Sequence, residues 1–468
     1  MAGKLKLISL FSGCGGMDYG FEAAGFDTAV ALEIDHACCE TLRQNRSWPV
    51  IESDIFSSAA ATKKILERAS LSRGEADLLV GGPPCQPFSK SGWWAHGGSA
   101  RLDDPRADTL MAYMRVVEEA QPRAFVLENV SGFAYSGKDE GLRYVLNQIA
   151  TINRRTGSNY VAQHAVLGAA DFGVPQLRER FFLVAARDGT AFKFPEPTFR
   201  ERDSAAEEAF LSSTNALPPY RTAWDALSDL PAFPEDEDLA MRGRWAELLP
   251  TIPEGQNYLW HTDRGGGRPL FGWRRRFWNF LLKLSKDLPS WTIQAQPGPS
   301  VGPFHWNNRR LSIRELCRLQ TFPDDVTISG NRTTAHRQIG NAVPSLLAEV
   351  IGRKIRTDLL GAPALRRPLK LLPPDRSPSP LPEPVEPVPA HYLRLVGTPT
   401  PSGHGQGLRC SCASSCFGVV GERARFVHSL TLAATSESIR ATITPTPSPR
   451  GRGGRGGGSR WAWSRTSR

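Results

Sequence analysis

Short apolar runs alternate with amphipathic stretches over the first 190 residues of this 468-residue chain. The apolar runs are typical of buried strands, and the amphipathic stretches have the spacing of helices. We predict strands over 5–11, 28–34, 77–81, 124–128 and 181–185, and helices over 17–24, 36–45, 108–119 and 141–153. Alternation at this spacing predicts an α/β fold with a mainly parallel, doubly wound sheet. Functional side chains are then expected at the carboxyl ends of the strands.

The alternation stops near residue 195, and the rest of the chain changes character in steps. Residues 196–255 are rich in proline and acidic residues, and residues 256–308 are aromatic and basic. Most of these aromatic side chains are expected in a core, whereas the arginines favour contact with phosphate. Helical periodicity returns over 312–319 and 343–359, and the second of these helices is expected to pack back onto the sheet. Residues 361–468 are rich in Pro, Ser and Gly and predict a disordered tail.

The net charge of +10 comes from this tail, because residues 361–468 hold 15 Lys/Arg against 5 Asp/Glu. The charge is therefore no indication of what the folded part binds. No apolar run approaches the ~20 residues that span a bilayer, and the apolar stretch at the N-terminus is too short for a signal peptide. A cytoplasmic protein with no membrane partner is expected.

Cysteine usage in this chain predicts neither disulfides nor a metal. Eight cysteines are too few and too scattered for a disulfide framework. Cys410, Cys412 and Cys416 lack the spacing of a standard zinc site and lie in a low-complexity stretch. We therefore expect no metal site.

The strongest chemical signal is GGPPCQPFS, residues 81–89, directly after a predicted strand. Prolines at 83, 84 and 87 restrict the backbone around Cys85, so its sulfur can be presented and held at one trajectory. A rigid turn with an incidental thiol is the alternative for PPC alone. The full nine-residue string favours a nucleophile.

This string resembles the catalytic motif of the DNA cytosine-5 methyltransferases, and other strings of that family follow in order. They are LFSGCGG at 10–16, ENV at 128–130, QLRER at 176–180, RRLSIRELCRLQTFPD at 309–324 and QIGNAVP at 338–344. The resemblance covers about residues 5–355. It implies a Rossmann-like, S-adenosylmethionine-dependent catalytic domain over 1–195 and 309–360, a smaller target-recognition domain inserted over 196–308, and the disordered tail over 361–468.

The resemblance implies S-adenosyl-L-methionine as the cofactor. Glycines at 13, 15 and 16 let the backbone approach its methionine part, and the following helix N-terminus favours its carboxylate. Glu33 matches the acidic residue that binds the ribose hydroxyls, and Asp54 with Ile55 resembles the pair that holds the adenine. The full expected set is Phe11, Gly13, Gly15, Gly16, Glu33, Ile34, Asp54, Ile55, Pro83, Leu110 and Asn341.

The expected catalytic residues are Cys85, Glu128, Arg178 and Arg180. The resemblance implies that Cys85 adds to carbon 6 of a flipped-out cytosine while Glu128 holds the base and acts as an acid. A general acid needs a raised pKa, which burial at a strand end can supply. Arg178 and Arg180 are expected to orient Glu128 and to grip the base or a phosphate. Residues 89–107, with Trp93 and Trp94, are expected to close over the site.

A monomer that acts on double-stranded DNA is expected. By resemblance, its role is in restriction–modification, beside a cognate restriction endonuclease that acts separately. Two alternatives stay open: methylation of RNA cytosine by the same fold, and a non-catalytic nucleic-acid-binding regulator. The sizeable recognition insert favours DNA over RNA, and the presence of Cys85 and Glu128 argues against the regulator.

Overall fold

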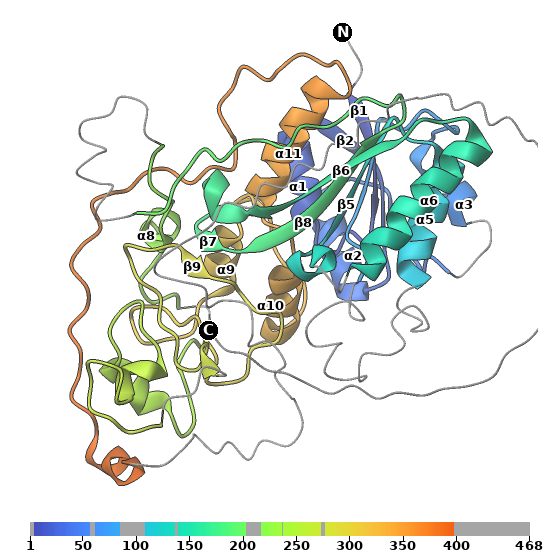
Figure 1. Cartoon of the computed structure of the whole chain (residues 1–468). Helices are drawn as coiled ribbons and strands as arrows, with labels where there is room; N and C mark the ends of the chain where they lie inside the picture. Colours follow the sequence, from blue (N-terminus) through green and yellow to red (C-terminus); the bar gives the residue numbers. More distant parts are fainter. Residues whose placement is uncertain are drawn as a thin grey trace, which may run out of the picture. The chain divides into compact units, whose positions relative to one another are not determined.

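A seven-stranded sheet in the order β3–β2–β1–β4–β5–β8–β6 carries the first half of the chain (Figure 1). The computed structural model describes residues 4–56, 61–84, 108–135, 139–202, 217–235, 237–272 and 277–396. Five neighbouring strands are parallel: β1 (Leu5–Leu10), β2 (Phe26–Glu33), β3 (Val50–Glu52), β4 (Leu78–Gly81) and β5 (Ala124–Val130). Strands β8 (Glu179–Ala186) and β6 (Val161–Gly168) complete the sheet as antiparallel neighbours. The predicted mainly parallel sheet is confirmed.

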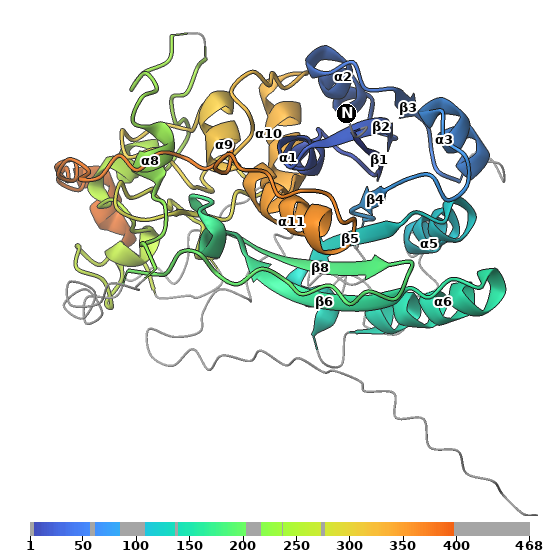
Figure 2. The same cartoon turned by 90° about the horizontal axis from the view of Figure 1, so that it is seen from above.

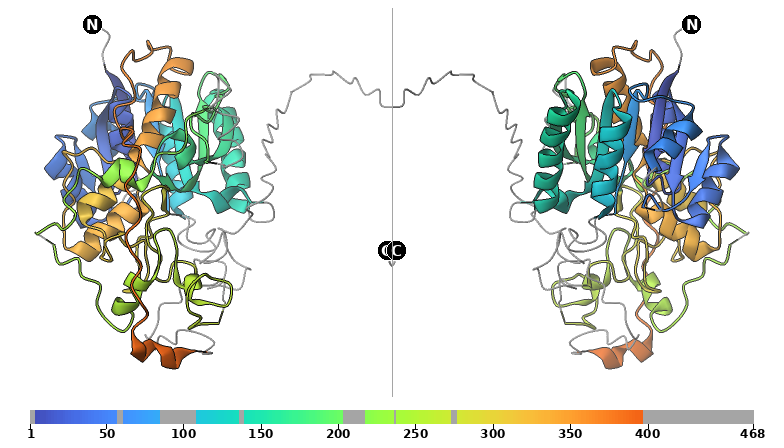
Figure 3. Two further views of the ribbon diagram at one scale, coloured as in Figure 1. Left: turned by 90° about the vertical axis from the view of Figure 1, so that its left-hand side faces the viewer. Right: turned by 90° about the vertical axis from the view of Figure 1, so that its right-hand side faces the viewer.

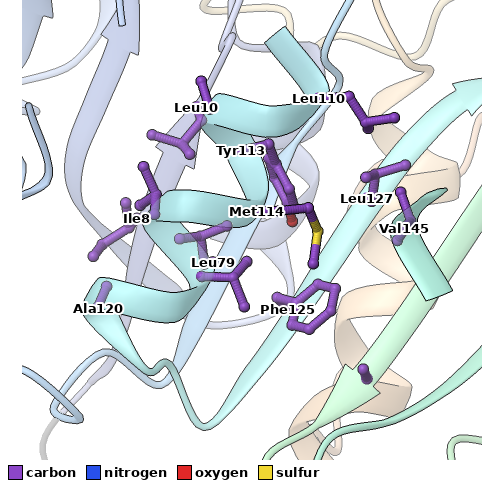
Figure 4. Close-up of a cluster of buried hydrophobic side chains, with 14 of the residues drawn as sticks. Ile8, Leu10, Leu79, Leu110, Tyr113, Met114, Ala120, Phe125, Leu127 and Val145 are labelled. Carbon is purple, nitrogen blue, oxygen red and sulfur yellow. The ribbon is translucent and has the colours of Figure 1, made fainter. Parts of the chain in front are cut away.

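Helices cover both faces of this sheet, as the predicted doubly wound fold requires (Figure 2). Side chains of α3 (Ala61–Ala69), α5 (Asp108–Ala120) and α6 (Glu140–Thr156) share one core cluster with β1, β4 and β5. Figure 4 shows part of it, with Ile8, Leu79 and Phe125 of three adjacent strands beside α5. Helices α1 (Gly16–Ala23) and α11 (Ser345–Asp358) pack on the other face. The return of the last predicted helix to the sheet is therefore confirmed.

Two strands of the main sheet and one helix packed on it escaped prediction. Strand β3 has only three residues, too few for a periodic pattern. Strand β6 lies at the edge of the sheet, and its sequence VAQHAVLG mixes polar and apolar side chains because much of it is only partly buried. Helix α3 has nine residues, and of these only Ala61, Thr62, Ile65 and Ala69 are buried. Helix α2 (His36–Asn45) has the predicted bounds.

Helices α1 and α11 cross so closely that Gly20 has no room for a side chain. A Cβ at this position would lie 2.2 Å from the backbone oxygen of Ser345 and 2.5 Å from the Cβ of Ala348. Alanine normally stabilises a helix interior relative to glycine. Here overpacking should dominate, so we expect Gly20→Ala to lower the free energy of unfolding by roughly 1–3 kcal/mol in urea titrations. Gly298→Ala is the control, because its Cβ would meet only Val301 at 3.5 Å; equal stability of both variants would contradict the close crossing.

Between the sheet strands and α11, regular secondary structure is sparse. Its elements are α8 (Ala223–Leu227), β9 (Ser290–Trp291), α9 (Ile313–Leu319) and α10 (Arg332–Asn341), with 3-10 turns η4 (Ala246–Thr251) and η5 (Tyr258–His261). The half of the chain that forms the sheet also contains the short strand β7 (Gln176–Leu177) and the 3-10 turns η2 (Ser131–Ala134) and η3 (Ala169–Phe172). Strands β7 and β9 pair in parallel. An aromatic cluster that includes Trp245, Tyr258, Phe271 and Phe304 replaces a sheet as the core of this region. The prediction that most of these aromatic side chains are core is confirmed for those described.

The start of the disordered tail was predicted too early in the sequence, at residue 361. Residues 361–396 belong to the same compact unit as the sheet and end in a 3-10 turn, η7 (Ala390–Leu395). Tyr392 and Leu395 are buried. The composition of this segment predicted disorder because it indicates neither a helix nor a sheet strand. Backbone and side-chain contacts to the folded part nevertheless hold the extended, proline-rich chain in place. Residues 397–468 lie outside the described ranges. In the described part of the chain, the helices are too short or too polar to cross a membrane.

Candidate active site

Glu128 lies near the carboxyl end of β5, against the segment that leads from β4 to Cys85. A Cβ on Gly82 would lie 2.7 Å from Oε2 of Glu128, so a larger residue at position 82 would displace this carboxyl group. The neighbouring Asn129 donates from Nδ2 to the backbone oxygen of Pro83 at 3.3 Å, and Pro83 itself is buried. Cys85 and the predicted closing segment 89–107 lie outside the described residues. The start of the nine-residue motif is therefore held directly beside a carboxyl group.

Glu128 forms a buried ion pair with Arg180. Nε of Arg180 lies 2.9 Å from Oε1 of Glu128, and the two side chains are 14% and 12% exposed. Burial raises the pKa of Glu128 above its usual value, and the nearby cations of Arg180 and Arg178 oppose that shift. The carboxyl group thus has the raised pKa expected of a general acid.

Arg178 links three segments and does not present its guanidinium at the surface. Its side chain is buried, and it donates from Nη1 to the backbone oxygen of Ile293 at 3.2 Å and from Nη2 to that of Gly340 at 2.8 Å. The predicted influence on Glu128 remains, through charge. A grip on a phosphate does not fit this conformation, because two backbone carbonyls already occupy the guanidinium end.

The turn after β1 is organised by Glu33 at the end of β2. Oε2 of Glu33 accepts from the backbone N–H of Gly13 at 2.7 Å, and Oε1 accepts from those of Ile34 and Asp35 at 2.8 and 2.9 Å. Gly13 and Gly15 have φ of +56° and +86°, which glycine adopts without strain. A Cβ on Gly13 would meet nothing within 4 Å, so the turn faces open space.

The first and last of the predicted motifs meet at this turn. A Cβ on Gly16 would lie 2.6 Å from the backbone oxygen of Val343, and Oγ of Ser345 donates to the backbone oxygen of Gly16 at 2.7 Å. Asn341, at the end of α10, is exposed. Folding thus completes the turn with a segment more than 300 residues away in sequence.

Exposed apolar side chains flank the same edge of the sheet. Ile34 after β2 is 63% exposed and Phe56 after β3 is 42% exposed, with exposed Asp54 close to Phe56 in sequence. Ile55 and Leu110, both also expected at the cofactor, are buried in the core cluster beside this edge, 2% and 4% exposed.

Two aromatic residues, Phe11 and Phe56, also lie at this edge of the sheet. Phe11 has φ of +53° and is partly buried against the same core cluster as Ile55. Phe56 was not predicted; the signal for it was its position two residues after Asp54, in the same turn.

The described residues contain no cluster of side chains suited to bind a metal ion. Within the ranges that the structure covers, no group of three or more His, Cys, Asp or Glu side chains could hold a metal ion. Cys410, Cys412 and Cys416 lie outside those ranges.

Comparisons with known proteins agree with this arrangement. The model of the family described as C-5 cytosine-specific DNA methylase matches residues 5–357. The type II methyltransferase M.SacI of Streptomyces achromogenes is 40% identical over 382 residues, which cover 76% of this chain and 94% of that protein. M.NgoFVII of Neisseria gonorrhoeae is 34% identical over 345 residues, 73% of this chain and 83% of that protein.

Solved structures support the fold. A crystal structure from an Escherichia coli prophage, described as a DNA modification methyltransferase, aligns with a TM-score of 0.54 at 21% identity and covers 76% of this chain and 99% of that one. Because the family model spans most of the chain and relatives share this much sequence, the chain belongs to the family of C-5 cytosine-specific DNA methylases.

Proposed function

We propose that this enzyme transfers a methyl group from S-adenosylmethionine to carbon 5 of cytosine within a specific duplex DNA sequence. We further propose that it does so through a covalent Cys85 adduct and base flipping, as a monomer in a restriction–modification system with a separate restriction endonuclease. The observation that carries the chemistry is the buried Glu128–Arg180 pair, set against the segment that leads to Cys85. Relatives that are type II methyltransferases support the biological role.

The turn after β1 and the adjacent edge fit S-adenosylmethionine. Open space over Gly13 leaves room for backbone to approach the methionine part, and Glu33 lies at the base of the turn. Ile34 and Phe56 offer apolar surface for the adenine beside the carboxylate of Asp54. Asn341 would close the pocket from α10. When bound, the sulfonium supplies the methyl group.

Glu128 and Cys85 would act at different positions of the cytosine ring. The Cys85 thiolate adds to carbon 6, and the ring electrons shift so that carbon 5 becomes nucleophilic and accepts the methyl group. Protonated Glu128 can donate to ring nitrogen 3, and Arg180 keeps its carboxyl group oriented. A base then removes the proton from carbon 5, and the carbon–sulfur bond breaks to restore the double bond.

Reaching a cytosine inside a duplex requires its extrusion, which costs roughly a few kcal/mol. We propose residues 196–308 as the target-recognition domain and 1–195 with 309–360 as the catalytic domain. The parallel pairing of β7 with β9 joins the two proposed domains beside Arg178. A base extruded at this junction would be close to the Glu128–Arg180 pair.

Replacing Glu33 by glutamine should weaken cofactor binding. The amide keeps one acceptor oxygen but turns an N–H group toward backbone N–H donors, so the turn of Gly13 loses a charge-assisted bond. We expect the Kd for S-adenosylmethionine, measured by calorimetry, to rise about 10-fold. Glu75→Gln, at the opposite end of the sheet with an exposed bond to the backbone N–H of Ser72, should leave it unchanged. An unaltered Kd for Glu33→Gln would contradict this organising role.

Expression of the full chain in a methylation-deficient bacterium tests the proposed function. Bisulfite sequencing of the host plasmid should show 5-methylcytosine at one recurring sequence. Unmodified plasmid together with newly methylated host tRNA would favour the RNA alternative. If neither DNA nor RNA is methylated, although the expressed protein is folded and binds DNA, the non-catalytic regulator is favoured.

A further inference from the structure

Residues 361–396, called the strap below, run from the end of α11 to η7 and lie beyond the range that the family model matches (Figure 1, orange). Their first part is anchored to the catalytic half. The fully buried carboxylate of Glu349 in α11 accepts from the backbone N–H groups of Lys370 and Leu371 at 2.8 and 2.9 Å. Arg353 donates to the backbone oxygen of Arg367 at 2.7 Å. The strap is thus fixed to the same helix that packs on the sheet.

The middle of the strap is held by side chains of the segment around α8. Asp375 pairs with Arg221 at 2.7 Å. Oδ1 of Asp225 accepts from the backbone N–H of Arg376 at 2.7 Å, and the guanidinium of Arg376 pairs with Asp229 at 3.0 Å. Charged contacts therefore continue along the strap.

The third anchor is a triad of charges, made by buried Lys286 and Glu254 of the proposed recognition domain and by Glu383 of the strap, whose side chain is 49% exposed. Nζ of Lys286, 3% exposed, lies 2.7 Å from Glu254 and 3.0 Å from Glu383 of the strap. It also donates to the backbone oxygen of Leu381 at 3.2 Å. The backbone N–H of Glu383 in turn donates to Glu254 at 2.9 Å. Because a buried cation is stable only among its partners, the two contacts from the strap, together with Glu254, hold Lys286 in position.

The strap ends inside the aromatic cluster. Tyr392 stacks on Trp245 with ring centroids 6.0 Å apart and an interplanar angle of 12°, and its hydroxyl donates to the backbone oxygen of Arg244 at 2.6 Å. Leu395 is buried in the same cluster. Both views of Figure 3 show η7 beside the green and yellow segments of this region.

The triad lies a short distance in sequence from the catalytic edge. Lys286 precedes β9, which pairs with β7, and Oγ1 of Thr292 donates to the backbone oxygen of Leu177 at 2.6 Å. The next residue, Ile293, supplies the carbonyl that Arg178 binds. Residues 286–293 are therefore held by the strap at one end and by the neighbour of the Glu128–Arg180 pair at the other.

We propose that the strap is a positioning element for target recognition in this enzyme, and that Glu383 is a positioning residue that acts through Lys286. By fixing Lys286, it sets where the segment after β9 lies against the catalytic edge, and hence how a DNA target is presented to Glu128. The proposal rests on the assignment of residues 196–308 to DNA recognition. It makes sequence discrimination depend on a segment outside the range of the family model.

Steady-state kinetics of Glu383→Gln in the full chain test this proposal. Loss of one charged contact to buried Lys286, from a half-exposed carboxylate, should raise KM for the target duplex about 5-fold and lower the ratio of kcat/KM between target and single-mismatch duplexes. The kcat on the target and the Kd for S-adenosylmethionine should stay within about 2-fold, since the anchors on α11 and the cofactor turn are untouched. Glu247→Gln is the matched control, because it removes an exposed 3.8 Å pair with His391 in η7.

Three outcomes would overturn the strap proposal. The first is an unchanged KM and mismatch ratio in Glu383→Gln. The second is a parallel loss of kcat, cofactor binding and thermal stability, which would show a merely structural role. The third is an equal effect of Glu247→Gln. Failure of the proposed function is recognised separately, because the unaltered enzyme would then methylate no DNA in the same assay.

Discussion

Replacing Cys85 by serine is expected to abolish methyl transfer to DNA, with kcat lowered by roughly 10⁴-fold or more. A thiol ionises near neutral pH and its thiolate is a strong nucleophile, whereas a serine hydroxyl stays protonated unless a base activates it. Without addition at carbon 6, carbon 5 of cytosine is a poor nucleophile. Transfer of a radiolabelled methyl group to a target duplex in a single turnover measures the loss.

Covalent trapping separates this explanation from loss of fold or of cofactor. On a duplex with 5-fluorocytosine at the target, the unaltered enzyme should form an adduct that resists denaturation, because fluorine cannot leave as a proton does. Cys85→Ser should form none, yet bind S-adenosylmethionine as before. Cys416→Ser, outside the range of the family model, is the matched control and should be fully active. An undiminished rate for Cys85→Ser would refute the covalent mechanism.

Replacing Glu128 by glutamine should lower kcat by roughly 10²- to 10⁴-fold, the usual contribution of a positioned general acid. Glutamine keeps the size of the side chain beside Gly82 and can still accept from Arg180, but it has no acidic proton to give. Binding of DNA and cofactor should change little by comparison. Glu179→Gln, an exposed neighbour in the QLRER motif, is the control and should retain activity.

The pH dependence of kcat gives a second measurement on Glu128. Burial raises the pKa of Glu128, so the protonated acid persists at higher pH than in a solvated glutamate. Activity should therefore be retained below the raised pKa and should fall as the pH rises through it. Glu128→Gln should lose that fall, because it has no group to titrate there. An identical pH profile in both proteins would exclude Glu128 as the acid.

Several features of the site follow from properties of single residues and their order, and these were predictable. Glu33 and Glu128 lie at or near strand ends as expected, since each follows an apolar run whose pattern stops there. The burial of Ile55 and Leu110 could not be predicted in this way. Both are apolar and next to the site in sequence, but whether such a side chain faces a ligand or the core depends on its neighbours in space.

By itself, the sequence determined the doubly wound sheet and the glycine turn around Gly13. These depend on periodicity, on allowed φ and on the absence of a Cβ, all of which are local properties of the chain. Only the tertiary structure decided that Arg178 binds the carbonyls of Ile293 and Gly340, and that Glu383 reaches Lys286. Such contacts join groups about 100 residues or more apart in sequence, and an arginine or glutamate has no periodicity or propensity that names its partner. The physical reason is that a buried charge is stable only where the whole fold brings its counter-groups together.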